Sequence, residues 1–316
     1  MFASMSIKTR FSNIFYIFLV YLIIFIVSFN INYYIVFDFN FSIFLRLFSL
    51  LIFNFFSFMT LITHLKSMFT NPGFVSYNFS YENNKIENFS LLSQQFNLYC
   101  NKCKNFRPFR AHHCKICNRC VLKMDHHCFW IFNCVGYYNQ KNFYQFLFYA
   151  TFGDLIAFLI LIFVCFEIDF DIEKNVNEKI NNVFQLIFQM GKQINIIIAI
   201  LCSFCMFFSI GFLWVKHTKM LMNNQTTIEK KIYSNWKKSL FYIDNKFLCF
   251  KSVMGKNLYE FFSLKFYDYG ILMKNQIEIL KKNENNKIEI ITIDLNNNNN
   301  NNKITKNNYE KLDETY

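Results

Sequence analysis

Cysteine and histidine residues gather between positions 100 and 134, where their spacing repeats. One set follows the pattern C-x2-C-x9-H-x6-C, and a second set follows the same pattern 14 residues later. Three thiolates and one neutral imidazole form a closed tetrahedral shell around zinc, as in structural zinc sites. The sequence therefore predicts two interleaved structural zinc sites. The first contains Cys100, Cys103, His113 and Cys120, and the second contains Cys114, Cys117, His127 and Cys134.

One cysteine of this cluster remains when the eight ligands are assigned. Cys128 ends the run Asp125-His126-His127-Cys128. A free thiol near a free imidazole and a carboxylate supplies a nucleophile, a general base and a group that orients the base. The run therefore predicts a covalent catalytic site, with Cys128 as nucleophile, His126 as base and Asp125 as the orienting group. In the alternative interpretation, Cys128 is a spare ligand or a structural thiol.

Long apolar segments must position this cluster. The chain has 316 residues, of which 53% are hydrophobic and only 17% are charged, whereas about a quarter of the residues of a soluble domain are charged. Four segments combine apolar character with very little charge, and each has the roughly 20 residues that a spanning helix needs. The sequence therefore predicts an α-helical polytopic membrane protein rather than a soluble protein with four buried helices. The predicted transmembrane segments are 14–36, 47–65, 143–166 and 194–215.

Positive charge predicts the orientation of these spans. The net charge is +12, and Lys and Arg gather before the first span, between the second and third spans, and after the fourth. Positive segments beside spans stay in the cytoplasm, where thiols remain reduced and bind metal. We therefore expect the small two-zinc domain to lie in a cytoplasmic loop. The expected cytoplasmic parts are 1–13, 66–142 with the zinc domain at about 98–143, 216–273 and 274–316, and the expected lumenal loop is 167–193.

The cysteine-rich segment resembles that of the DHHC-type protein S-acyltransferases, or palmitoyltransferases. The resemblance centres on Asp125-His126-His127-Cys128 and covers roughly residues 10–265. Outside the cysteine-rich segment, residues 71–73 are similar to the family's Asp-Pro-Gly motif, and residues 226–229 match its Thr-Thr-x-Glu motif. The residues of these two motifs are Asn71, Pro72, Gly73, Thr226, Thr227 and Glu229. The matching positions within the cysteine-rich segment are His112, His113, Cys114, Lys123, Met124, Trp130, Asn133, Cys134, Val135, Gly136, Asn139 and Phe143.

Two positions near Cys128 depart from the family pattern. Phe129 stands where the family usually has Pro, so a fixed φ angle beside the nucleophile is lost. Phe132 stands where the family usually has Asn, so a polar side chain that could bind the local backbone is lost. Neither position is a predicted ligand or a member of the catalytic group. We therefore expect these departures to affect the rate rather than the chemistry.

The resemblance implies an enzyme that moves a long-chain fatty acyl group, mainly palmitoyl, from acyl-CoA to cytoplasmic cysteine thiols of proteins through an acyl-Cys128 intermediate. It also implies two structural zinc ions, palmitoyl-CoA as donor, and substrate proteins with a cysteine near the bilayer. The implied location is an endomembrane such as the Golgi or the endoplasmic reticulum, with no nucleic-acid partner. Two other functions stay open: a zinc-binding adaptor would not need Cys128, and a transporter would need more ionisable groups in its spans than Asp154.

CoA and the acyl chain would need binding residues near the nucleophile. CoA is strongly anionic, so cations near the cysteine cluster or at the end of the fourth span are candidates. Trp130 suits the membrane interface because its ring is apolar with one polar edge. In the alternative interpretation, the cations are solvated or attract anionic lipid. The predicted acyl-chain and CoA residues are Trp130, Gly153, Arg119, Lys123 and Lys216.

Small residues share one face of the third span around Gly153. Small residues at helical spacing usually mean close helix packing in a membrane, and the alternative is room for the end of an acyl chain. Asp154 lies next to Gly153, and an acid within the membrane needs a partner. The candidate partners are Asn54, Asn195 and Ser203.

The C-terminal part of the chain divides into two segments. Apolar residues at helical spacing predict an interfacial amphipathic helix. Beyond about Lys274 the chain is rich in Asn, with seven consecutive Asn at 296–302, which is typical of a disordered segment. The apolar residues of the predicted helix are Leu258, Phe261, Phe262 and Phe266.

Overall fold

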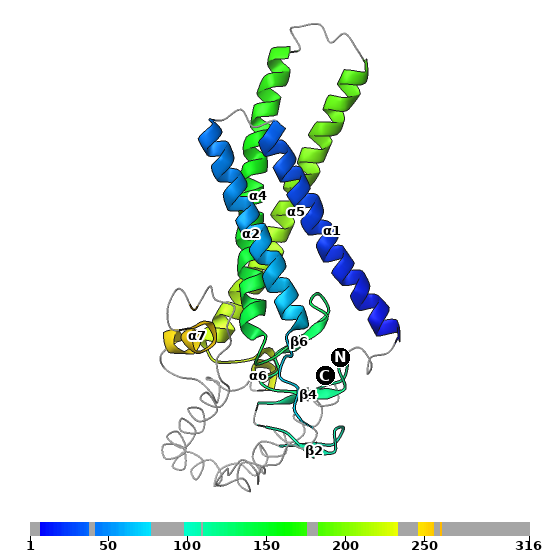
Figure 1. The fold of residues 1–316 in the computed structure, drawn as a ribbon, viewed down its shortest axis with the longest axis vertical. Coiled ribbons are helices and arrows are strands. Elements are labelled where there is room, and N and C mark those ends of the chain that lie inside the picture. Colours follow the sequence, from blue (N-terminus) through cyan, green and yellow to red (C-terminus); the bar gives the residue numbers. More distant parts are fainter. Residues whose placement is uncertain are drawn as a thin grey trace, which may run out of the picture. The chain divides into compact units, whose positions relative to one another are not determined.

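Four long helices dominate the computed structural model (Figure 1). They are α1 (Ile7–Phe37), α2 (Ile43–Phe69), α4 (Gln140–Asn175) and α5 (Val183–Met222). Each contains a stretch that is long and apolar enough to cross a membrane, which confirms the predicted helical multi-pass fold. The structure describes residues 7–37, 42–76, 98–108, 110–175, 183–232, 246–255 and 260.

The helices extend beyond the predicted spans because backbone hydrogen bonding continues where apolar composition stops. The predicted third span ends at residue 166, whereas α4 continues to Asn175, and α5 begins eleven residues before the predicted fourth span (residue 183 against 194). An apolar segment ends at a charged residue such as Lys192, whereas the helix continues through that residue. The apolar spans within the helices are Ile14–Phe37, Ile43–Phe69, Gln140–Phe166 and Met190–Met222.

The chain forms two compact units. Unit 1 contains Met1–Asn13, Ser67–Asn142 and Thr218–Tyr316, and unit 2 contains Ile14–Lys66 and Phe143–His217.

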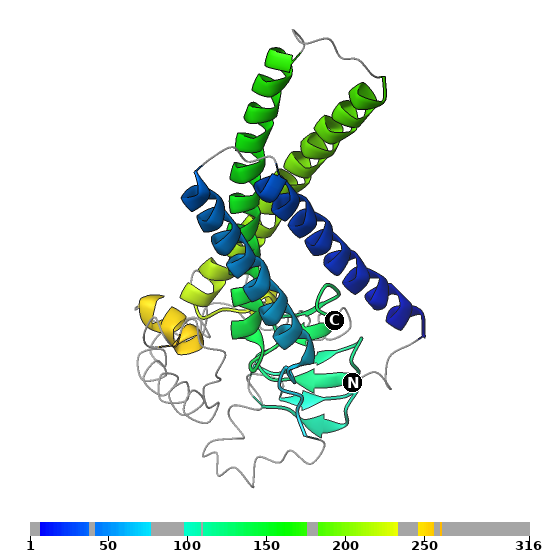
Figure 2. The same cartoon turned by 45° about the horizontal axis from the view of Figure 1, so that its top comes forward.

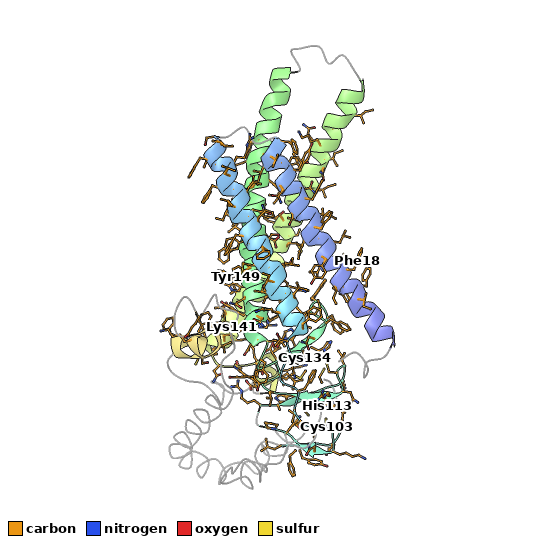
Figure 3. All side chains as sticks on the ribbon, viewed as in Figure 1. Phe18, Cys103, His113, Cys134, Lys141 and Tyr149 are labelled. Carbon is orange, nitrogen blue, oxygen red and sulfur yellow. The ribbon has the colours of Figure 1, made fainter. Side chains whose placement is uncertain are left out.

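Unit 2 has a core to which all four long helices contribute. Its buried residues include Ile31 of α1, Phe53 of α2, Leu161 of α4 and Ile196 of α5. Many other large apolar side chains are exposed, including Phe18, which is labelled in Figure 3. Because lipid solvates apolar side chains, an exposed apolar surface on long helices is what a membrane protein requires.

Polar side chains connect α1 with its neighbours in unit 2. Asn54 donates to Asn32 Oδ1 (2.8 Å), and Asn195 donates to Asn30 Oδ1 (2.7 Å). Two of the three partners expected for Asp154 therefore bind α1 instead, and the third, Ser203, has a buried hydroxyl with no hydrogen-bond partner among the described residues. The expected pairing of Asp154 is not seen among the described residues, because the amide side chains of α1 bind both asparagines.

Unit 1 is built on three short antiparallel hairpins (Figure 2). The first pairs β1 (Tyr99–Cys100) with β2 (Asn105–Phe106), the second pairs β3 (His112–Cys114) with β4 (Arg119–Val121), and the third pairs β5 (His126–Cys128) with β6 (Asn133–Val135). Two short helices follow the last long helix. They are α6 (Thr227–Ile232) and α7 (Lys246–Met254).

The Asn71-Pro72-Gly73 motif leads from α2 into unit 1. Asn71 Oδ1 accepts hydrogen bonds from the backbone N–H groups of Gly73 (2.9 Å) and Phe74 (3.0 Å), and Gly73 has a φ of 105°. This left-handed backbone strongly favours glycine. The turn directs the chain along β4, where Val75 N–H donates to Cys120 O (2.9 Å). The predicted amphipathic helix around Phe262 and the Asn-rich segment lie outside the described residues.

Candidate active site and metal centres

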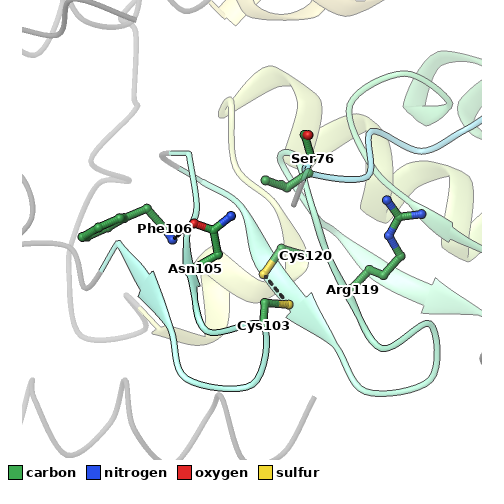
Figure 4. Close-up of a pocket in the computed structure, with 7 residues that line it drawn as sticks. Ser76, Cys103, Asn105, Phe106, Arg119 and Cys120 are labelled. Atoms are coloured by element: carbon green, nitrogen blue, oxygen red, sulfur yellow. Dashed lines mark hydrogen bonds between the residues drawn. The ribbon is translucent and has the colours of Figure 1, made fainter. Parts of the chain in front are cut away.

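The first predicted ligand set forms a tight cluster. His113 Nδ1 lies 3.6 Å from Cys100 Sγ and 3.2 Å from Cys103 Sγ. Cys120 Sγ lies 4.0 Å from that nitrogen and 3.8 Å from Cys103 Sγ, and Figure 4 shows this pair of sulfurs. Zinc–sulfur bonds of about 2.3 Å give a tetrahedral edge of about 3.8 Å. The donor atoms therefore fit around one tetrahedral ion.

The second predicted ligand set repeats this geometry. His127 Nδ1 lies 3.7 Å from Cys114 Sγ and 3.4 Å from Cys117 Sγ. Cys134 Sγ lies 3.5 Å from the same nitrogen and 3.5 Å from Cys117 Sγ. Both groups can hold a metal ion, so the predicted pairing into two sets agrees with the structure. His113 and Cys134 are labelled in Figure 3.

Each cluster combines residues from two successive hairpins. The C-x2-C pair lies on the turn of one hairpin, where Cys103 N–H donates to Cys100 Sγ (3.4 Å). The His and the last Cys face each other across the next hairpin, as in the pairing of His113 with Cys120. This arrangement explains why a repeat of 14 residues in sequence makes two interleaved sites.

The sulfurs within each cluster differ strongly in pKa. In the first cluster, the hydrogen bond with Cys120 lowers the pKa of Cys100 to about 3, although burial opposes this shift. In the second cluster, the hydrogen bond with Cys114 raises the pKa of Cys117 to about 12, while the pKa of Cys114 is lowered. One sulfur of each cluster is thus favoured as a thiolate. Three thiolates so close together would need a cation among them.

The predicted catalytic residues are linked in series on β5. His126 Nδ1 lies 2.6 Å from Asp125 Oδ2, and the Cys128 side chain is hydrogen-bonded to His126. Burial favours the neutral imidazole, but the hydrogen bonds and charges of Asp125 and Cys128 outweigh this effect and raise the pKa of His126 to about 10. Cys128 and Asp125 are buried, whereas His126 is half-buried. The structure therefore brings the three residues together.

The Thr-Thr-x-Glu motif holds the carboxylate of this group. Thr227 donates from its backbone N–H to Asp125 Oδ1 (2.6 Å) and from its hydroxyl to Asp125 Oδ2 (3.1 Å). Thr226 and Glu229 form a reciprocal cap at the start of α6, because Glu229 N–H donates to Thr226 Oγ1 (3.2 Å) and Thr226 N–H donates to Glu229 Oε2 (2.9 Å). This is the capping box of a helix N-terminus, and it presents Thr227 to Asp125.

A buried ion pair joins this motif to the cysteine-rich segment. Arg110 donates from Nε to Glu229 Oε1 (2.6 Å) and from Nη2 to Glu229 Oε2 (2.8 Å), and its Nη1 binds Asn224 Oδ1 (3.1 Å). Both charged side chains are only 2% exposed. This pair leaves no signal in the sequence, because the partners are 119 residues apart and neither lies in a local pattern that indicates the other.

We expect Glu229→Gln to destabilise unit 1. Gln keeps the capping box but leaves Arg110 as an uncompensated buried charge, which costs about 3–5 kcal/mol. Thermal unfolding of the purified protein in detergent should show a lower Tm than the parent. Lys230→Gln, at an exposed position of the same helix, is the matched control and should leave Tm unchanged. An unchanged Tm for Glu229→Gln would show that the pair contributes nothing to stability.

The hairpin that carries Cys128 is fixed to the last turn of α2. Asn133 lies opposite Cys128 in the register of the third hairpin. Its Nδ2 lies within hydrogen-bonding distance of the carbonyls of Ser67 (3.3 Å), Met68 (3.1 Å) and Thr70 (2.8 Å). These carbonyls are at a helix end, where no intrahelical donor remains. The side chain of Asn133 therefore ties the strand beside the nucleophile to this turn.

Gly136, which follows β6, allows a close approach of backbones. A Cβ atom there would lie 2.5 Å from Pro72 O and 2.6 Å from Val121 Cγ1, which is too close for any side chain. Asn139 Oδ1 accepts a hydrogen bond from Gly136 N–H (2.9 Å). These contacts give a physical reason for Asn133, Gly136 and Asn139 among the matching positions.

The predicted acyl-chain and CoA residues have different surroundings. Trp130 is 46% exposed on the turn of the third hairpin, and the Arg119 guanidinium lies over the Phe74 ring at 4.7 Å from its centroid. Lys123 is only 3% exposed, and burial lowers its pKa to about 7. Lys216 and Gly153 belong to unit 2. The assignment of these residues to CoA or the acyl chain stays a prediction, and the burial of Lys123 does not favour it.

A small surface hollow lies beside the first metal cluster rather than beside Cys128 (Figure 4). We do not assign it to the acyl donor. The residues that line it are Val75, Ser76, Cys103, Asn105, Phe106, Arg119 and Cys120.

These features define a multi-pass membrane protein with two candidate Cys/His metal sites beside a linked Asp–His–Cys group. A family model described as DHHC palmitoyltransferase matches residues 93–234. Probable protein S-acyltransferase 12 of Arabidopsis thaliana is 30% identical over 214 residues, which are 65% of this chain and 68% of the relative. The chain belongs to the DHHC palmitoyltransferase family.

Two further relatives match over shorter segments. Palmitoyltransferase ZDHHC3 of Rattus norvegicus is 38% identical over 120 residues, which are 37% of this chain and 40% of the relative. Palmitoyltransferase PFA3 of Saccharomyces cerevisiae is 48% identical over 68 residues, which are 22% of this chain and 19% of the relative. In these two comparisons the chain thus spans less than half of the relative's length.

Proposed function

We propose that this protein is a protein S-acyltransferase that moves a long-chain acyl group, mainly palmitoyl, from acyl-CoA to cysteine thiols of proteins. The observation that carries the proposal is the linked Asp125–His126–Cys128 group outside both metal clusters. A thiol held by an imidazole and a carboxylate is an activated nucleophile. The names of the relatives, protein S-acyltransferase and palmitoyltransferase, support the same reaction.

The proposed reaction has two thioester exchanges. The protonated ring of His126 stabilises the Cys128 thiolate, which attacks the acyl carbonyl. The carbon–sulfur bond to CoA breaks, and His126 gives its proton to the departing CoA thiolate. The neutral ring then takes the proton of an incoming protein thiol, whose sulfur attacks acyl-Cys128 and releases the Cys128 thiolate. Asp125 holds Nδ1 of the ring throughout, which leaves Nε2 for the sulfur.

We propose that the metal in both clusters is zinc. The donor sets are three sulfurs and one imidazole nitrogen with tetrahedral spacing, which suits a d10 ion of intermediate softness. The ions would hold the hairpins on both sides of Cys128 in place and take no part in the proton transfers. Removal of zinc is therefore expected to lower acylation through loss of folding.

The proposed orientation places unit 1 in the cytoplasm of an endomembrane such as the Golgi or the endoplasmic reticulum. Its support is the excess of positive charge in the segments outside the two short loops. The proposed substrates are proteins that carry a cysteine close to the cytoplasmic face of the bilayer.

The experiment that tests the function uses the purified full-length protein and palmitoyl-CoA with a labelled acyl chain. We expect label on the protein that neutral hydroxylamine removes, because hydroxylamine cleaves thioesters. Addition of a cysteine-containing peptide should then move the label to the peptide. A protein with both metal ions that never acquires the label would overturn the proposal.

We also propose that Gly153 borders the end of the acyl chain. On this basis, Gly153→Phe should lower the rate of acylation with stearoyl-CoA about tenfold more than the rate with myristoyl-CoA, since a bulky side chain closes the site. The measurement is the rate of Cys128 acylation across chain lengths.

The alternative for Gly153 is close helix packing, and it has direct structural support. A Cβ atom at Gly153 would lie 3.5 Å from the Cβ of Phe56 in α2, which is an ordinary contact. Gly153→Ala is therefore a tolerated control. A uniform fall for all chain lengths with a lower Tm in Gly153→Phe would exclude the acyl-chain role and leave packing as the explanation.

A further inference from the structure

All three hairpins of unit 1 turn in the same way. The last residue of the turn is left-handed in each: Lys104 has a φ of 50°, Asn118 of 51° and Phe132 of 52°. These positions are 14 residues apart, as are the metal ligands of the two clusters. None of the three is glycine, and a left-handed Phe is uncommon. The shared conformation therefore reflects a common fold of the hairpins rather than local sequence preference.

The same 14-residue spacing relates the cysteines at the turns of the three hairpins. Cys100, Cys114 and Cys128 occupy one equivalent position, and all three are buried. Three residues later, the first two hairpins have Cys103 and Cys117, whereas the third has Ile131. We call the two cysteine positions of one hairpin a knuckle.

The first two knuckles have the same geometry. In each, the backbone N–H of the second cysteine donates to the sulfur of the first at 3.4 Å. Each knuckle faces a His and a Cys on the following hairpin, as Cys114 and Cys117 face His127 and Cys134. After the third hairpin the chain enters α4 at Gln140, so no such pair follows it.

We infer that Cys128 occupies the first-ligand position of a third, incomplete knuckle, and that Ile131 keeps metal away from the nucleophile. Ile131 is at the position of the second ligand and is fully buried. Bonding to zinc withdraws negative charge from a thiolate and so weakens its attack on an acyl carbon. The third hairpin thus carries a buried sulfur at the position that is a ligand in the first two hairpins, with His126 beside it, and the apolar Ile131 supplies no second sulfur.

The role of Ile131 is specific because a second thiol would complete a chelate. A cysteine at this position would stand to Cys128 as Cys103 stands to Cys100. Together with His126, which is hydrogen-bonded to Cys128, it would supply two sulfurs and one nitrogen. Three such donors with a water molecule satisfy tetrahedral zinc. The acylation readout of this inference rests on the proposed function, whereas its metal readout does not.

The test is Ile131→Cys in the full-length protein, purified with zinc and analysed for metal content. We expect three zinc ions per chain instead of two. Acylation of Cys128 should fall at least tenfold in micromolar free zinc and recover when a chelator removes the weakest ion. Ile131→Ser, which makes a similar cavity without a thiol, should hold two ions and show no sensitivity to zinc. Ile131→Cys combined with Cys128→Ser should also hold two.

The outcomes separate this inference from the proposed function. Two zinc ions per folded Ile131→Cys chain, with acylation unaffected by zinc, would overturn the inference. If Ile131→Cys does not fold, Ile131→His supplies a ligand with a larger side chain, and the same zinc measurements on that variant decide. Binding of a third ion without any acylation of the parent protein would support the knuckle and overturn the proposed function.

Discussion

Cys128→Ser is expected to abolish acyl labelling while both metal ions stay bound. A serine hydroxyl is a far weaker nucleophile than a thiolate at neutral pH, so labelling should fall by about a thousandfold or more. Cys128 belongs to neither Cys/His cluster, and its buried side chain differs from serine by a single atom. Metal content, membrane insertion and Tm should therefore match the parent, and hydroxylamine-sensitive label measures the loss.

Cys249→Ser is the matched control for this variant. Cys249 is also a buried cysteine in unit 1, but it lies outside the metal clusters and the Asp125–His126–Cys128 group. The Cys249→Ser variant should acquire the acyl label as the parent does. Loss of one metal ion from Cys128→Ser would contradict the interpretation, because it would make Cys128 a ligand and weaken the case for an enzyme.

His126→Ala is expected to slow labelling rather than abolish it. The imidazole supplies proton transfer, which typically contributes about 10²- to 10⁴-fold, whereas the thiol remains. The rate of label incorporation should fall within that range with zinc content unchanged. A rate equal to that of the parent would exclude His126 from the chemistry and leave its contact with Asp125 as a structural feature.

The sequence could predict the membrane fold and the ligand pairing because both leave regular patterns. Charge-free segments of lipid length identify spanning helices directly, and the 14-residue repeat assigns all eight ligands before any contact is known. The run Asp125–Cys128 is contiguous, so its members lie close together in any fold. These are local signals, and local signals can be read from one chain.

The contacts that hold the site in place could not be predicted in this way. The Arg110–Glu229 pair and the bonds of Asn133 to the end of α2 join residues far apart in sequence, and single polar residues leave no periodic pattern. The left-handed Phe132 also contradicts the ordinary preference for Asn or Gly in that conformation. Tertiary structure imposes that backbone, so only the structure could show that the third hairpin turns in the same way as the first two.

The other large effect is expected from Cys103→Ser, which should lose metal and unfold the cysteine-rich segment. The parent should hold two zinc ions per chain. The hairpins have strands of only two or three residues, too few to form an apolar core, so metal binding must supply their folding free energy. Structural zinc sites supply about 10–16 kcal/mol in isolated fingers at neutral pH.

Loss of Cys103 should affect the second site as well as the first, because both sites share one hairpin. The β3–β4 hairpin carries both His113 and Cys120 of the first cluster and Cys114 and Cys117 of the second. We therefore expect fewer than two ions per chain, rapid proteolysis between residues 98 and 135, and no acyl label. Cys202→Ser, on the exposed face of α5, is the control and should behave as the parent. A parent protein that is folded and fully active with a single ion per chain would disprove the two-site pairing, because the second ligand set would then fold its hairpins without metal.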